Sequence, residues 1–223
     1  YPAYTIEAQR GTPTQVTYVN QLGTATAPPF LQQYLTVDQT LHWADPLGQH
    51  NSMPMTPYAG SAPAVVHLHG GEVPSAFDGH PDSWWTPGAE GTDPLPVDTY
   101  RGYVTNAYNY PNSQEAATLW FHEHALGITR LNVYAGLAGF YFLRDTANEP
   151  TNLPSGNYEI EIAIQDRMFD TNGQWFFPDV GINPMEHPFW IPEFIGDAIV
   201  VNGKTWPFLN VEPRRYRFRF LNG

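Results

Sequence analysis

The 223-residue sequence predicts an all-β protein built as an antiparallel β-sandwich. Short segments rich in β-branched and aromatic residues recur along the chain, and two of them alternate apolar with charged residues. Proline (22 residues) and glycine (19 residues) separate these segments and leave little room for long helices. With 42% hydrophobic and 14% charged residues, a chain of this length can bury a substantial core.

Six segments are expected to form strands: residues 15–20 (QVTYVN), 64–69 (AVVHLH), 118–122 (TLWFH), 137–143 (LAGFYFL), 158–164 and 215–220. The fourth is almost continuously apolar, which favours a buried strand. The last two alternate with a period of two. In 158–164 isoleucines alternate with glutamates, and in 215–220 aromatic residues alternate with arginines. This pattern is typical of half-buried strands, with the apolar side chains on the covered face.

The polar, turn-rich stretch 144–156 (RDTANEPTNLPSG) predicts a boundary between domains. We assign residues 1–145 to a first domain, 146–156 to a linker and 157–223 to a second domain. The second portion is too short for a whole sandwich of about 100 residues, so we expect it to be incomplete. Residues 70–99 show no periodicity, and the aromatic residues of this long loop favour an ordered, functional segment.

The net charge and the missing cysteines exclude several functions. A formal charge of −12 disfavours nucleic acid and anionic membrane surfaces as partners. No apolar run approaches the roughly 20 residues of a membrane span. Because the chain has no cysteine, it cannot form disulfides, use a thiolate in catalysis or build a blue-copper site from its own residues.

Two histidine pairs stand at the ends of predicted strands, His67 with His69 and His122 with His124. Residues i and i+2 of a strand project from the same face, so two neighbouring strands would direct four imidazoles into one cavity. Neutral imidazole is a good ligand for copper, zinc, iron and nickel. Four buried imidazoles without a metal would each need other hydrogen-bond partners. The spacing therefore predicts a metal site, and it suits a cluster better than a single ion.

The other histidines and the four methionines are interpreted as structural. His42 and His50 are expected on the surface or in loops, His80 in a turn, and His187 in a structural position. The methionines are scattered along the chain, so packing is a better interpretation than a copper relay: Met53, Met55, Met168 and Met185.

Longer motifs around the histidines resemble a known family. The stretches VVHLHGG and LWFHEHALGITRLNVYAGLAGFYFLRD resemble the first two copper-binding motifs of multicopper oxidases, and most of all those of spore-coat-type bacterial laccases. The DGHPDSW stretch from Asp78 to Trp84 and the segment VNGKTWPFLNVEPRRYRFRFLN are similar too. The resemblance implies a cupredoxin-like Greek-key β-sandwich followed by the beginning of a second cupredoxin-like domain. It also implies an extracellular or spore-coat location.

The resemblance also implies roles for individual residues. His67 would bind the type 2 copper of a trinuclear cluster, and His69, His122 and His124 would bind the type 3 pair. Asp78 would supply protons or orient a ligand; the alternative is a plain Asp-Gly turn. Dioxygen would be the electron acceptor, and a small phenolic or other aromatic compound the reducing substrate.

Two further motifs of the family, H-P-x-H-x-H and H-C-H-x-x-x-H, do not occur in these residues. We therefore expect half of the cluster ligands here, and the other half and the type 1 copper on a C-terminal portion or a partner chain. One alternative is a copper-binding or scaffold protein without catalysis. Another is a zinc hydrolase, which the His122-Glu123-His124 spacing disfavours because it differs from H-E-x-x-H.

Overall fold

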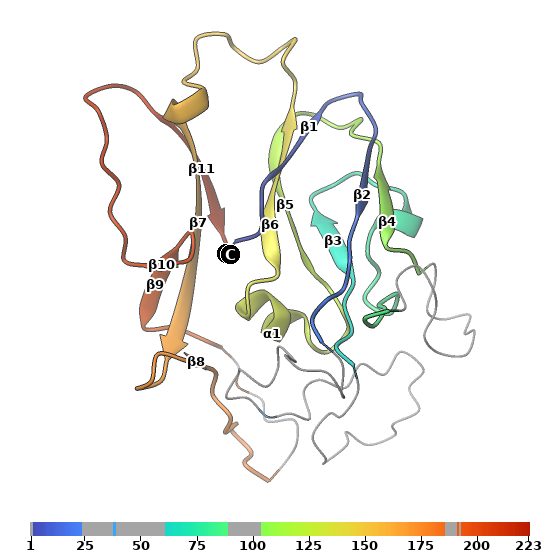
Figure 1. Cartoon of the computed structure of the whole chain (residues 1–223), viewed down its shortest axis with the longest axis vertical. Helices are drawn as coiled ribbons and strands as arrows, with labels where there is room; N and C mark the ends of the chain where they lie inside the picture. The colour runs from blue at the N-terminus through green and yellow to red at the C-terminus, as the bar shows by residue number, and fades with distance from the viewer. Residues whose placement is uncertain (1, 24–37, 39–60, 89–103, 186–190, 192) are drawn as a thin grey trace.

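The computed structural model describes residues 2–23, 38, 61–88, 104–185, 191 and 193–223, and its elements form three β layers (Figure 1). The middle layer is a four-stranded sheet in the order β1-β6-β5-β3. Its strands are β1 (Ile6–Gln9), β6 (Ala138–Arg144), β5 (Ala117–Glu123) and β3 (Val66–His69). The all-β prediction is confirmed, because α1 (Thr129–Tyr134) is the sole α-helix within the described ranges.

The first core lies between the middle sheet and a two-stranded ladder of β2 (Thr14–Thr17) and β4 (Ala107–Tyr110). The sheet contributes Leu68, Phe121, Tyr141 and Leu143, and the ladder contributes Tyr108 and Tyr110. Trp84 and Trp85 of the long loop are buried in the same core, and Trp85 bridges to Ala64. The described part of the loop is thus ordered, as predicted from its aromatic content. Residues 89–99 lie outside the described residues.

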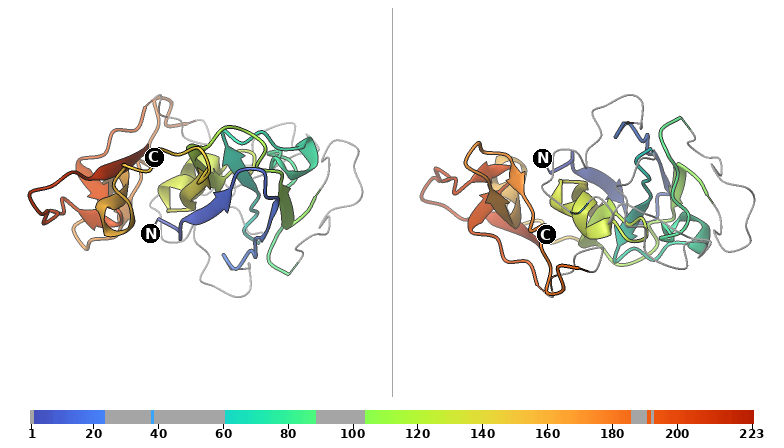
Figure 2. Two further views of the ribbon diagram at one scale, coloured as in Figure 1. Left: turned by 90° about the horizontal axis from the view of Figure 1, so that it is seen from above. Right: turned by 90° about the horizontal axis from the view of Figure 1, so that it is seen from below.

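A second sheet packs on the other side of the middle layer, coloured orange to red in Figures 1 and 2. Its order is β10-β9-β7-β11, with β8 (Trp175–Phe176) beside the end of β7 (Glu159–Phe169). The other strands are β9 (Ala198–Val201), β10 (Lys204–Thr205) and β11 (Arg217–Asn222). Phe140 and Phe142 of β6 pack against Ala163 of β7 and Leu221 of β11. Strand β6 is therefore covered on both faces, which explains its continuous apolar run.

Most strand pairs are antiparallel, as expected for the predicted sandwich, but two are parallel. Strand β1 pairs with β6 in parallel, and β11 pairs with β7 in parallel. The other strand pairs are antiparallel. A period-two pattern reports which face a side chain occupies and carries no information about the direction of the neighbouring strand.

The apolar faces of β7 and β11 are the more exposed faces of these strands within the described residues. Phe218 and Phe220 are 40% and 62% exposed, and the isoleucines of β7 are partly exposed. The opposite face, which carries Glu159 and Arg219, packs against the middle sheet. There Glu159 accepts hydrogen bonds from Arg144 of β6 and Arg219 of β11. Charged residues occupy the covered face because they neutralise one another.

Three short elements complete the described fold. The helical turn η3 (Ser75–Phe77) directly precedes Asp78, and η4 (Gly156–Tyr158) leads into β7. Helix α1 closes one end of the middle sheet between β5 and β6 (Figure 1). Among the described residues, no helix has the length and apolar character that a membrane crossing requires.

Candidate metal centre

The register of β3 and β5 brings the two histidine pairs together. His67 lies opposite His122 in the antiparallel ladder, and His69 lies opposite Trp120. The imidazoles of His67 and His122 therefore project from the same face of the middle sheet, because directly opposed residues share a face. Leu68 and Phe121 point the other way, into the first core. Apolar residues alternate with the histidines along these strands, so the apolar side chains lie on one face of the sheet and the histidines on the other.

The four rings form one contiguous cluster. His67 stacks on His124, with ring centroids 4.7 Å apart, and stands edge-on to His122 at 5.5 Å. His69 Nδ1 lies 3.2 Å from His122 Nε2. Ligand atoms of His67, His69 and His122 all lie within 4.8 Å of one another. The structure thus brings all four predicted histidines together, His124 through its contacts with the His67 and His122 rings.

Backbone carbonyls hold three of the four rings in a defined tautomer. The Nδ1–H groups of His67, His122 and His124 donate to the carbonyl oxygens of Asp78 (2.6 Å), Glu123 (2.7 Å) and Gly79 (2.8 Å). Since a carbonyl can only accept, Nδ1 carries the proton and Nε2 keeps its lone pair; that of His122 faces His69 Nδ1 at 3.2 Å. Such a hydrogen bond to the far nitrogen is what orients metal-binding histidines.

The donor set fits a metal ion. Two nitrogens bound to one metal at about 2 Å each lie roughly 3 Å apart, and His69 Nδ1 and His122 Nε2 show that separation. Burial, reinforced by the neighbouring imidazoles, lowers the pKa of His122 to about 4, so this ring is neutral at physiological pH. Burial also lowers the pKa of His124. Neutral imidazoles are the form that binds copper.

The Asp78-Gly79 turn lies directly against the cluster. Besides its backbone contact, Asp78 places Oδ1 3.3 Å from His67 Nδ1, and its side chain is 48% exposed. Gly79 has φ +74°, and a Cβ at this position would collide with the backbone oxygen of Val66. The tight turn is therefore restricted to glycine at position 79, and it places two successive carbonyls next to the His67 and His124 rings.

Among the described residues, the one other histidine is His80, which lies outside the cluster. His80 has a 60% exposed side chain, and its Nδ1 accepts a hydrogen bond from the Asp82 backbone N–H, in line with the turn predicted there. His42, His50 and His187 lie outside the described residues. So do Met53 and Met55, whereas Met185 is highly exposed.

Two neighbours of the cluster were not singled out from the sequence. Trp120 packs its indole against both His69 and His122, at 5.1 and 4.4 Å between ring centroids. Glu123 is buried at 3% exposure between the two histidines of its motif. Burial raises its pKa to about 7, against the opposing effect of its hydrogen bonds. The sequence does hold a signal for Glu123. It follows the core residues Leu119 and Phe121 at intervals of two, so it falls on the core-facing side of the strand.

A β-sandwich that clusters four histidines on one sheet face has the donor set of a metal-binding protein. The family profile described as "Multicopper oxidase" matches residues 58–148, which include all four histidines. The chain is 41% identical to the laccase of Bacillus stratosphericus over 99% of its length, and 38% identical to the laccase of Bacillus subtilis (strain 168) over 100%. The chain belongs to the multicopper oxidase family.

The solved structures agree with this assignment. The multicopper oxidase McoA from Aquifex aeolicus superposes on 98% of the chain with a TM-score of 0.61 and 25% sequence identity. The chain spans 39% of the length of each of the two Bacillus laccases and 35% of the Aquifex chain. The cupredoxin-like fold expected from the motifs is thereby confirmed.

Proposed function

We propose that these residues form part of a laccase-like oxidase that removes single electrons from small phenolic or other aromatic substrates and reduces dioxygen to water. His67 would bind the type 2 copper of a trinuclear cluster, and His69, His122 and His124 the type 3 pair. The observation that carries this proposal is the convergence of four imidazoles, three of which hold their proton on Nδ1 and leave Nε2 unprotonated.

Copper bound there would supply electrons one at a time, because it cycles between Cu(I) and Cu(II). The protein's own part is to fix the ligands and to deliver protons. The carbonyls of Asp78, Gly79 and Glu123 hold the rings before metal arrives. The half-exposed Asp78 carboxylate reaches from solvent to the His67 ring, so it can pass protons toward the cluster as water forms.

The other cluster ligands and the type 1 copper would come from residues outside these 223, on a C-terminal portion or a partner chain. A type 1 site needs a cysteine ligand, and the sequence contains none. We assign residues 1–145 to a first cupredoxin-like domain, 146–156 to a linker and 157–223 to the start of a second. The exposed apolar face around Phe218 and Phe220 supports this division, because a sandwich would cover it with a second sheet.

Copper analysis and oxygen uptake of the full-length gene product test the proposal. His122→Ala should lower copper content and reduce phenol-dependent oxygen uptake by more than about a hundredfold, since losing a ligand costs more than losing an outer partner. His80→Ala is the matched control, because this exposed histidine lies outside the cluster; it should leave both unchanged. A wild-type protein that binds copper but consumes no oxygen would favour the non-catalytic scaffold.

A further inference from the structure

A buried carboxylate links the backbone segments that carry the two histidine pairs. Glu123 Oε1 accepts hydrogen bonds from the backbone N–H of Val65 (3.3 Å) and of Ala125 (2.5 Å). Val65 stands two residues before His67, and Ala125 directly follows His124. One oxygen atom thus ties the start of β3 to the end of the second motif. The His124 N–H completes the link by donating to the Val65 carbonyl at 2.9 Å.

Stability alone gives a poor reason for this residue. Glu123 occupies the core-facing side of β5, where Leu119 and Phe121 are its neighbours in the alternation. An enclosed carboxylate loses its hydration, and apolar residues usually serve a core at least as well. The Asn132 side chain favours the charged form of Glu123. Within the described residues, however, neither Glu123 Oε2 nor Asn132 Nδ2 has a hydrogen-bond partner. What the carboxylate does supply is an acceptor for two amides that flank the cluster.

We propose that Glu123 is a positioning residue for the copper centre: its Oε1 holds the two histidine-bearing segments at the separation that the metal requires. It acts from the face opposite the imidazoles, through the backbone, and does not contact the metal. This inference rests on the copper ligation proposed above.

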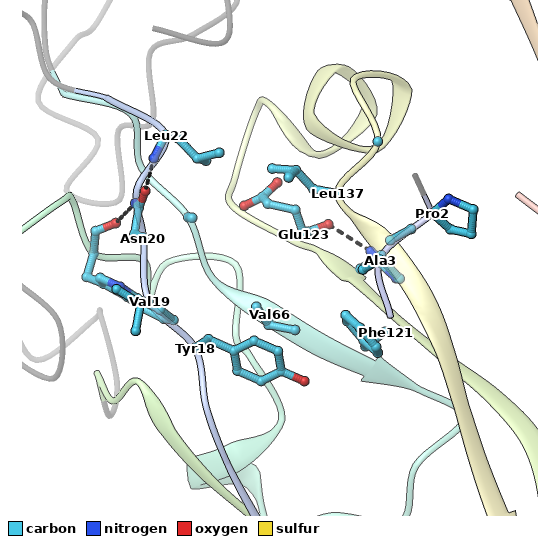
Figure 3. A pocket seen from close by; sticks show the side chains of 15 residues that line it. Pro2, Ala3, Tyr18, Val19, Asn20, Leu22, Val66, Phe121, Glu123 and Leu137 are labelled. Carbon is cyan, nitrogen blue, oxygen red and sulfur yellow. Dashed lines mark hydrogen bonds between the residues drawn. The ribbon is translucent and has the colours of Figure 1, made fainter. Parts of the chain in front are cut away.

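A cavity beside Glu123 makes the test practicable. Its volume is about 340 Å³, and Tyr18, Val66, Phe121 and Leu137 line it together with Glu123 (Figure 3). Side chains of similar size therefore have room at position 123. Glu123→Gln keeps an oxygen that can accept both amides, whereas Glu123→Leu keeps the volume and removes the acceptor. Glu159→Leu is the matched control, a buried carboxylate that joins strands far from the histidines in sequence.

The experiment measures copper affinity by chelator competition and hydrogen exchange of the Val65 and Ala125 amides in metal-free, full-length protein. Glu123→Leu should bind copper about 10–100-fold more weakly and lose protection at both amides. Glu123→Gln should stay within about threefold of wild type and keep that protection. Glu159→Leu should lower the melting temperature and leave copper affinity unchanged.

Several results would overturn the positioning role. One is unchanged copper affinity in a folded Glu123→Leu protein. Another is a loss in Glu123→Gln as large as in Glu123→Leu, which would mean that the charge and not the acceptor is needed. If Glu123→Leu does not fold, Glu123→Gln decides alone: kept amide protection with copper affinity within about threefold of wild type supports the role, and a larger loss overturns it. A wild-type protein without copper would instead refute the proposed function, which keeps the two failures apart.

Discussion

Asp78 contacts the His67 ring in two ways that a substitution can separate. Its backbone carbonyl accepts the Nδ1 proton, and its carboxylate lies at 3.3 Å from the same nitrogen. Asp78→Asn keeps the carbonyl and removes the ionisable group. We expect full copper content, because the ring stays oriented, and a fall in the turnover number of roughly 10²–10⁴-fold, the usual contribution of a positioned acid or base.

Oxygen-uptake rates and copper analysis of the purified full-length variant check this expectation. Glu72→Gln, which removes an exposed carboxylate from the same loop, should leave the rate unchanged. Loss of copper together with activity in Asp78→Asn would show that the side chain holds the site together and does not transfer protons.

At the scale of single residues, the sequence predicts the clustering of the histidines better than the groups that hold their rings. The i, i+2 spacing places His67 and His69 on one strand face whatever the rest of the fold does. The supports of the rings are backbone carbonyls of Asp78, Gly79 and Glu123, and a carbonyl leaves no trace in residue type. Glu123 itself interrupts an apolar alternation, a signal that becomes meaningful only when the register of β3 is known.

Among the connecting elements, the turn after η3 contacts the candidate metal centre through its backbone, at the rings of His67 and His124. Gly79→Ala adds a Cβ that collides with the Val66 backbone and forces an alanine into a left-handed conformation. We expect a loss of roughly 1–3 kcal/mol in unfolding free energy, together with weaker copper binding because the Gly79 carbonyl moves away from His124.

Gly173→Ala provides the control for that turn. Gly173 has a similar φ of +76° but no atoms within 4 Å of an added Cβ. The Gly173→Ala variant should therefore lose stability only through the left-handed backbone conformation of its alanine, and its copper affinity should be unchanged. Thermal unfolding and chelator competition distinguish the two variants, and equal copper affinities in both would contradict a role for the Gly79 carbonyl in fixing His124.

The strands show where periodicity succeeds and where it fails. The run in β6 predicts burial correctly, since every residue from Ala138 to Leu143 is buried. In β7 and β11 the charged face packs on the middle sheet, and the apolar face is the more exposed one within the described residues. Alternation separates two faces but cannot say which of them meets another layer. The deciding information is the charge complementarity of Glu159 with Arg144 and Arg219, which come from three different strands.

For the whole molecule, these charged groups join the two larger sheets. Arg144 of β6 donates to both oxygens of Glu159 at 2.8 and 2.9 Å. Arg219 of β11 donates to Glu159 and also to Thr118 of β5 at 2.6 Å. Thr5 near the N-terminus donates to Glu161 of β7 at 2.9 Å. The packing of the second sheet on the first therefore depends on ionised side chains, and it should respond to pH.

Glu159 sets the direction of that response. Burial alone would raise its pKa, but hydrogen bonds from Arg144 and Arg219 outweigh burial and hold the pKa below the ordinary value of 4.5. A carboxylate with a lowered pKa in the folded state stabilises the fold above its unfolded pKa. That stabilisation is lost as the pH falls through the folded pKa. We therefore expect the melting temperature of metal-free protein to drop below about pH 4.5.

Glu159→Gln isolates this contribution. At pH 7 the variant should be roughly 1–3 kcal/mol less stable, because charged hydrogen bonds are replaced by neutral ones. The gap should narrow as the pH falls below about 4.5, because wild-type Glu159 then becomes protonated as the protein unfolds. Metal-free protein is used because protons then no longer compete with copper at the histidines. Glu115→Gln, at the exposed pair with Arg10, should follow the wild-type curve throughout. A gap that stays constant from pH 7 to 3 would show that the shape of residue 159, and not its charge, holds the sheets together.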